Sequence, residues 1–148
     1  MSEIIVIGGG AAGMMAAITA ARRGAGVTLL EPNERLGKKL NITGKGRCNV
    51  TNDCDQETLM ANIPGNGRFL YSALTRFTPQ DAMAFFEALG VPLKVERGNR
   101  VFPVSDRSFD ISGALERELR RLRVRILRER AAEITAEDGR VTGVQTDR

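Results

Sequence analysis

Three features of residues 1–31 predict an α/β fold with a parallel sheet. The uninterrupted apolar run Ile4–Ile7 is typical of a strand that is buried on both faces of such a sheet. A glycine-rich turn follows, and an Ala- and Met-rich stretch without helix breakers then extends to about Arg23. A second apolar strand, 27–31, completes a β–α–β unit of roughly thirty residues.

The glycines of the turn fit the pattern G-x-G-x-x-G as Gly8, Gly10 and Gly13. In this pattern the first glycine makes a tight turn, the second leaves the backbone bare where a pyrophosphate approaches, and the third permits close helix–strand contact. The helix beginning at Ala11 and Ala12 would direct unpaired N–H groups and its positive dipole end towards that phosphate. We therefore predict a Rossmann-like FAD/NAD(P)-binding fold.

An acidic residue ends the second strand. Glu31 lies 18 residues beyond Gly13, close to the roughly 20 expected of the carboxylate that accepts hydrogen bonds from a ribose 2′-OH. A carboxylate there disfavours a 2′-phosphate, so NADP is not the expected occupant of this site. The alternative is a glycine turn that binds no ligand.

The segment from Pro32 to Asp55 fits neither helical nor strand periodicity. It interleaves glycines with lysines and arginines, and a loop of this length inside a compact domain is usually functional or mobile. Glycine permits close approach to a ligand, and the cations suit a phosphate or an anionic ring. We therefore expect a ligand-binding loop here.

The glycine turn with Glu31, the string Gly37–Asn52 and the string Arg100–Arg107 together resemble one family. It is the YhiN/BaiN-type (aminoacetone-oxidase-like) NAD(P)/FAD-dependent oxidoreductases, in their amino-terminal portion, and the resemblance covers essentially the whole chain. It implies that the turn and Glu31 hold the ADP half of FAD, and that the loop Thr43–Asn49 runs close to the flavin. The family more often carries glycine where this chain has Lys45.

In the wider superfamily that the chain resembles, backbone near the position of Ala131 often meets adenine. The candidate cofactor-binding residues are Gly8, Gly10, Ala11, Ala12, Gly13, Glu31, Lys39, Thr43, Gly44, Gly46, Arg47, Cys48, Asn49 and Ala131. The resemblance implies FAD as the cofactor, with NAD(P)H as a candidate electron donor and an unidentified small-molecule substrate. Flavin itself carries the hydride or electron chemistry, and the protein binds and orients it. No side chain stands out as a general acid or base, so the catalytic residues stay unknown.

Residues 56–107 are predicted to form a helical and hairpin insertion between residues 1–55, the nucleotide-binding half with its loop, and residues 108–148. Thr78–Asp81 has the composition of a helix start, and Gly98-Asn99 that of a hairpin turn. In the last segment we expect a helix over Ser108–Leu122 and a third parallel strand over Val124–Leu127. An antiparallel extension then follows, formed by residues 131–136 and 140–146 with Asp138-Gly139 between them.

A complete doubly wound sheet has a further parallel strand beside the first one. We therefore expect this chain to be the amino-terminal part of a longer flavoprotein. Without that strand, Ile4–Ile7 has an unpaired apolar edge that favours association.

The composition excludes several classes of site. The chain has no histidine, and its only cysteines are Cys48 and Cys54, which excludes Ser-His-Asp triads and Cys/His zinc sites, so no metal is expected. No apolar run approaches the ~20 residues of a membrane span. The first residues lack the basic region of a signal peptide, so we expect a cytoplasmic location.

Two other functions stay open from the residues alone. A nucleotide fold can serve as a non-catalytic FAD- or NAD-binding module. The formal net charge of +4 and the arginines of Arg117–Arg130 suit a nucleic-acid-binding protein. A solvated helix face is the simpler explanation, because no aromatic residue accompanies these arginines for base stacking, so no nucleic acid partner is expected.

Overall fold

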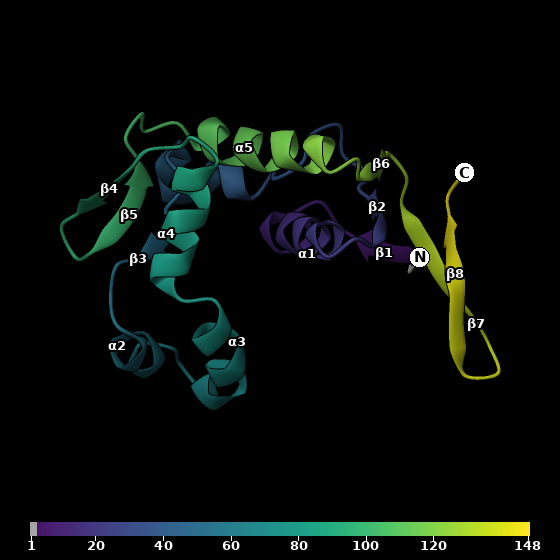
Figure 1. Ribbon diagram of the computed structural model, residues 1–148, viewed down its shortest axis with the longest axis horizontal. Coiled ribbons are helices and arrows are strands. Elements are labelled where there is room, and N and C mark those ends of the chain that lie inside the picture. Colours follow the sequence, from purple (N-terminus) through teal and green to yellow (C-terminus); the bar gives the residue numbers. More distant parts are fainter. Residues whose placement is uncertain (1–2) are drawn as a thin grey trace. The chain divides into compact units, whose positions relative to one another are not determined.

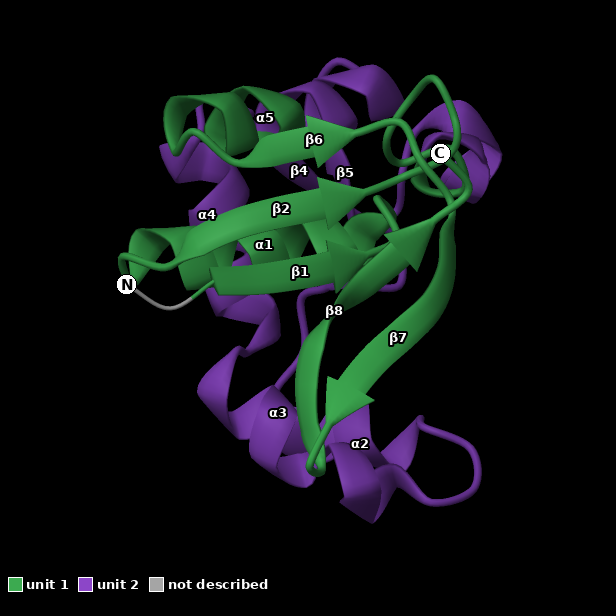
Figure 2. Cartoon of the chain, turned by 90° about the vertical axis from the view of Figure 1, so that its right-hand side faces the viewer, with its two compact units in different colours: residues 1–40, 115–148 green, residues 41–114 purple. Residues whose placement is uncertain are grey.

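The computed structural model describes residues 3–148, which divide into two compact units. The first unit is Met1–Leu40 with Leu115–Arg148, and the second is Asn41–Ala114 (Figure 2). These boundaries differ from those expected after residues 55 and 107. The loop after Leu40 belongs to the second unit because the strand that follows it pairs with the hairpin of that unit.

The first unit contains the parallel sheet. β1 (Glu3–Ile7), β2 (Gly26–Leu30) and β6 (Arg125–Leu127) lie in the order β1-β2-β6, and Figure 2 shows their arrows side by side and pointing the same way. α1 (Ala11–Arg22) packs on β1 and β2 and buries Met14, Ala17 and Ile18. The α/β fold with a third parallel strand is therefore confirmed.

β1 is more exposed than the sequence predicts. Its pattern is that of a strand buried on both faces, but Ile4, Ile5 and Ile7 are 38%, 42% and 52% exposed. The reason is its position at the edge of the sheet, where only β2 pairs with it among the described residues. The prediction of burial on both faces is wrong for this chain, whereas the expected apolar edge is present.

β7 (Ala131–Glu137) and β8 (Arg140–Thr146) form the antiparallel extension of the first unit (Figure 1). Asp138 and Gly139 both have positive φ, 49° and 75°, as a two-residue hairpin turn requires. The Asp138-Gly139 turn predicted from the sequence is confirmed.

The second unit surrounds a small antiparallel sheet. β3 (Thr51–Asn52), β5 (Arg100–Pro103) and β4 (Leu93–Glu96) lie in the order β3-β5-β4, and the chain between β4 and β5 turns at the expected Gly98 and Asn99. After β3 this unit contains α2 (Gln56–Ala61), the 3₁₀ helix η2 (Gly67–Leu70), α3 (Tyr71–Arg76) and α4 (Pro79–Ala88). A further 3₁₀ helix before β3 and the first turns of a helix that begins at Ser108 also belong to it.

α4 begins where the sequence predicts. The Thr78 hydroxyl accepts a hydrogen bond from the Asp81 N–H, and the Asp81 carboxylate accepts one from the Thr78 N–H. This reciprocal pairing satisfies two of the N–H groups that a helix start leaves unpaired. α4 then packs against β3 and β4.

None of the helices within residues 3–148 has the length and apolarity needed to cross a membrane.

α5 (Ser108–Arg121) contributes its last turns to the first unit, where a buried carboxylate joins it to α1. The Glu118 side chain is 3% exposed and accepts hydrogen bonds from Arg22 of α1 and from Arg121, with donor–acceptor distances of 2.7–2.9 Å. The hydrogen bonds from Arg121 and then from Arg22, opposed by burial, lower the pKa of Glu118 from 4.5 to about 2. The carboxylate is therefore ionised at neutral pH.

The Glu118→Gln variant should lose about 3 kcal/mol of stability at pH 7, because the pKa difference corresponds to that free energy. The folded pKa lies below the ordinary value, so the stabilisation is present above about pH 4.5 and is lost as the pH falls towards about 2. Urea unfolding from pH 2 to pH 7 should show the difference from wild type shrinking over that interval.

Glu116→Gln is the matched control, since Glu116 pairs at 3.6 Å with Arg120, whose side chain is 74% exposed. A pair of this kind contributes roughly 0.5 kcal/mol or less. A constant difference between wild type and Glu118→Gln at every pH would contradict the assigned ion pair.

Candidate functional site

The glycine turn joins β1 to α1 through backbone contacts in the first unit. Gly8 has φ +100°, a conformation that favours glycine, and its N–H donates to the Leu30 carbonyl at 2.8 Å. A Cβ added at Gly13 would lie 1.8 Å from the Gly8 carbonyl oxygen. The tight turn and the close helix–strand contact therefore have the geometry that the pattern predicts.

Gly10 differs from these two glycines. A Cβ added there would meet nothing within 4 Å, and Gly10 is exposed. The protein itself does not require glycine at this position. The open space is consistent with a ligand that approaches the backbone.

Gly9 is a closely packed residue to which the pattern assigns no role. A Cβ there would lie 2.4 Å from Cδ2 of Leu36, and the Gly9 carbonyl accepts a hydrogen bond from the Gly37 N–H at 2.8 Å. The chain after β2 therefore packs directly on the turn. The third consecutive glycine, one more than G-x-G-x-x-G needs, was the available signal.

Glu31 holds the turn from the end of β2. One carboxylate oxygen accepts from the Gly9 N–H at 2.8 Å, and the other accepts from the backbone and side-chain nitrogens of Asn33 at 2.8 and 2.6 Å. Burial raises the pKa of Glu31, but the hydrogen bonds from Asn33 and Gly9 and the charge of Arg128 more than offset it. Glu31 is therefore an anion that holds the turn, and its role towards a ribose stays a prediction.

The amino end of α1 is open to an anion. Its N-cap, Gly10, has extended backbone and provides no side-chain hydrogen bond, and the first turn carries no acidic residue. Ala11 and Ala12 at the start of the helix are exposed. Unpaired N–H groups and the helix dipole make such an end favourable for a phosphate.

Two further residues that were predicted to bind the cofactor, Lys39 and Ala131, lie elsewhere in the first unit. Lys39 is exposed in the turns that follow β2. Ala131 is the first residue of β7, pairs with Thr146 and is half-buried. Their roles towards a ligand stay predictions.

The glycine-rich loop, defined here as Thr43–Asn49, belongs to the second unit and interrupts the 3₁₀ helix η1 (Leu40–Gly46). Gly44, Lys45, Gly46 and Cys48 all have positive φ, from 56° to 82°. This conformation costs a residue other than glycine about 1–2 kcal/mol. Lys45, at φ 58°, thus occupies a position whose backbone conformation favours glycine.

The side chains proposed for the flavin end are engaged inside the second unit. Cys48 is 4% exposed, and burial raises the pKa of its thiol despite a hydrogen bond with Thr43. The Asn49 side chain, oriented with its amide nitrogen towards the neighbouring carbonyls, donates to Thr51 and Val101 at 3.0 and 3.2 Å.

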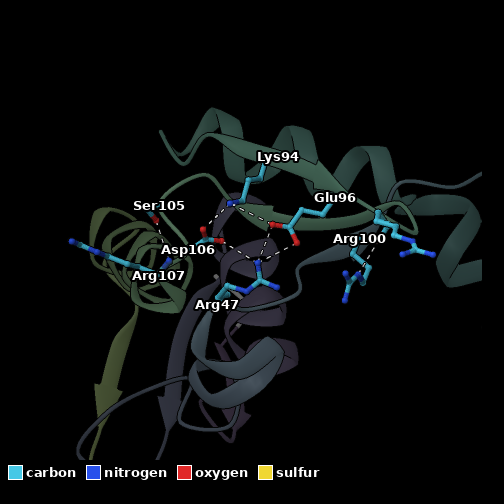
Figure 3. Close-up of polar contacts among 8 residues, drawn as sticks. Arg47, Lys94, Glu96, Arg100, Ser105, Asp106 and Arg107 are labelled. Atoms are coloured by element: carbon cyan, nitrogen blue, oxygen red, sulfur yellow. Dashed lines mark hydrogen bonds and ion pairs between the residues drawn. The ribbon is translucent and has the colours of Figure 1, made fainter.

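Arg47 is held by two carboxylates. Its Nη1 lies 3.0 Å from Glu96 and 3.3 Å from Asp106, and Figure 3 shows all three side chains pointing towards one another. Lys94 adds a contact of 2.7 Å to Asp106, which lowers the pKa of that carboxyl. The result is an ion-pair cluster of Arg47, Lys94, Glu96 and Asp106.

Asn41 anchors the chain just before the loop. The hydroxyl of Ser108 donates to its carbonyl at 2.9 Å and that of Ser112 to its side-chain oxygen at 2.8 Å. Both serines are almost fully buried, 1% and 3% exposed. Sequence reasoning missed these residues, although two serines four apart within the apolar stripe of α5 were a usable signal.

Within residues 3–148, no group of acidic residues and cysteines could hold a metal ion.

A family profile described as "HI0933-like protein Rossmann domain" matches residues 2–148. The chain belongs to this family. Membership confirms the family resemblance and the Rossmann-like fold predicted from the sequence.

Two relatives and one solved structure extend the comparison. The chain is 41% identical over 129 residues to a 3-dehydro-bile acid delta(4,6)-reductase of Clostridium scindens, covering 85% of this chain and 31% of that protein. It is 36% identical over 90 residues to a ribosomal RNA dihydrouridine synthase of Haemophilus influenzae, covering 61% of this chain and 22% of that protein.

The fold is similar to the crystal structure of Thermovibrio ammonificans THI4, with a TM-score of 0.64 at 13% identity, covering 99% of this chain and 47% of that one. This similarity supports the fold alone. The chain thus spans less than half the length of each of these three proteins.

Gly13→Ala should destabilise the fold by about 3 kcal/mol or more, because the added methyl group overlaps a backbone oxygen that cannot easily move. Gly10→Ala should cost about 1 kcal/mol or less, since its methyl group enters open space. Chemical unfolding of both variants measures the difference. Equal losses would show that α1 does not approach the turn as described.

Proposed function

We propose that this chain is the FAD-binding region of a flavin-dependent oxidoreductase. The observation that carries the proposal is the uncapped amino end of α1 beside the glycine turn, with the charged Glu31 at the end of β2. The open helix end fits a pyrophosphate. Glu31 fits a ribose, because its three hydrogen bonds leave one of about four acceptor positions for a hydroxyl.

The choice of FAD rests on the family resemblance. It assigns the ADP half to Gly8, Gly10, Gly13 and Glu31, and the flavin half to the glycine-rich loop. Bound FAD would supply hydride and electron transfer, while the protein binds and orients the cofactor. NAD(P)H is the proposed electron donor, and a cytoplasmic location stays a prediction.

The names of the two relatives indicate a common bond type. A 3-dehydro-Δ4,6 bile acid carries double bonds conjugated to a ketone, and making dihydrouridine saturates a ring double bond conjugated to a carbonyl. We therefore propose that the protein containing this chain reduces a carbon–carbon double bond conjugated to a carbonyl. The step adds a hydride to the carbon remote from the carbonyl and a proton to the nearer one.

RNA is the second candidate substrate, favoured by the relative that acts on ribosomal RNA and by the net charge of +4. Affinity for a uridine-containing RNA should then fall steeply with salt. Salt-independent or absent binding would remove this candidate for the isolated chain.

We also propose that the free edge of β1 pairs with further polypeptide, since the relatives have additional chain and the edge is apolar. The mass of the native polypeptide in its source cell tests this proposal. A mass equal to the 16.1 kDa of this chain would contradict a covalently linked segment.

The function is tested with purified protein titrated with FAD. Binding should shift the flavin absorption spectrum, and Gly10→Ala should weaken it at least tenfold, because its methyl group occupies the space proposed for the pyrophosphate. Gly143→Ala, on β8, is the matched control and should bind as wild type. A wild-type protein that takes up no FAD contradicts the proposal.

The same complex, photoreduced without oxygen, separates an enzyme from a non-catalytic module. 2-Cyclohexen-1-one should reoxidise it faster than cyclohexanone, which lacks the double bond. Equal rates for the two compounds would argue against the proposed bond type.

A further inference from the structure

The glycine-rich loop has a strained backbone that its own sequence does not enforce. Among residues 44–48, only Arg47 lacks a positive φ, and Lys45 and Cys48 adopt the left-handed conformation without being glycine. Such a conformation persists only where surrounding contacts determine it. Contacts from outside the loop must therefore maintain this conformation, and Arg47 makes several of them.

Arg47 is fixed on three sides. Its guanidinium carbon lies 4.0 Å from the centre of the Phe102 ring, and its Nη1 donates to both oxygens of Glu96, at 3.0 and 3.2 Å, and to Asp106 at 3.3 Å. Glu96 ends β4, Phe102 lies in β5, and Asp106 follows β5. Arg47 thus ties the loop to the hairpin and to the turn after it (Figure 3).

The charges of the ion-pair cluster balance. Two cations, Arg47 and Lys94, face two anions, Glu96 and Asp106, and the four side chains are 28–43% exposed. Single pairs of this exposure stabilise weakly, but a closed network together with an aromatic contact fixes one geometry. An arginine neutralised in this way is poorly placed to bind an anionic ligand directly.

Other parts of the loop are better exposed. Thr43, Lys45 and Gly46 are exposed, and the neighbouring Ile42 is 72% exposed. A Cβ at Gly44 would lie 2.9 Å from the Asn49 nitrogen and 3.0 Å from Phe102, so the loop also packs closely on the hairpin. The loop has an inner side held by the hairpin and an outer side formed by these exposed residues.

We propose that Arg47 is a positioning residue: with Glu96, Asp106 and Phe102, it holds the glycine-rich loop in the conformation that receives the flavin half of the cofactor. This inference rests on the proposed function for its ligand. It reassigns Arg47 from a direct contact to an indirect role. Contact with the flavin is left to the backbone and the outer side of the loop.

The first test uses the protein without cofactor. Glu96→Gln combined with Asp106→Asn removes both carboxylates and keeps Arg47. Amide hydrogen exchange within residues 43–49 should become at least tenfold faster, and trypsin should cleave after Lys45 more readily. The control variant Glu133→Gln/Glu137→Gln makes an equal charge change at exposed positions of β7. It should leave the exchange rate and the cleavage by trypsin unchanged.

The second test measures affinity for FAD and for ADP. Arg47→Ala and the Glu96→Gln/Asp106→Asn variant should each weaken FAD binding at least tenfold and change ADP binding less than twofold. Arg140→Ala, at an exposed position of β8, is the control for loss of an arginine.

If Arg47→Ala loses FAD affinity and the Glu96→Gln/Asp106→Asn variant keeps it, the inference is overturned in favour of a direct contact between Arg47 and the cofactor. Unchanged exchange in the carboxylate variant would also overturn it. If wild type binds no FAD, the proposed function fails, while the exchange measurement still decides whether the cluster holds the loop.

Discussion

The first unit depends on one backbone contact, the approach of the start of α1 to the turn that ends β1. Gly13 leaves no room for a side chain beside the Gly8 carbonyl oxygen. This contact sets the amino end of α1 at the carboxyl edge of the sheet. Glu31 lies at the same edge, because it directly follows β2. Glu31 then returns a hydrogen bond to the turn through the Gly9 N–H. The elements proposed to bind a dinucleotide are therefore the same elements that hold the turn together.

The second unit shows a different constraint. Its glycine-rich loop is held by contacts that lie far away in the sequence, since Glu96 and Asp106 are 49 and 59 residues from Arg47. Surface ion pairs are weak individually, so the loop depends on their combination with the Phe102 ring and with the anchored Asn41. A loop of this kind can be rigid without being buried, and rigidity before binding reduces the entropy lost when a ligand is ordered.

Local sequence signals predicted much of this structure because they act over a few residues. The spacing of Gly8 and Gly13, the cap at Thr78 and the turn at Asp138-Gly139 each follow from neighbouring residues. The sequence could not show that β1 lies at an exposed edge, because the same apolar run serves a central or an edge strand. It could not show that Glu31 bonds Gly9 or that Arg47 meets two carboxylates, because those contacts depend on how distant segments pack. The roles of the candidate residues towards a ligand therefore stay predictions, whereas their contacts within the protein are seen only in the structure.

The proposed function depends above all on the amino end of α1 binding the pyrophosphate of a dinucleotide. This binding is tested most directly by following the backbone amide NMR signals of isotope-labelled protein during titration with ADP. We expect the largest shifts at Gly10, Ala11 and Ala12, where the helix end is open, with smaller shifts at the buried Gly9. Saturation by ADP that leaves these amides unchanged, or shifts confined to other segments, would contradict it.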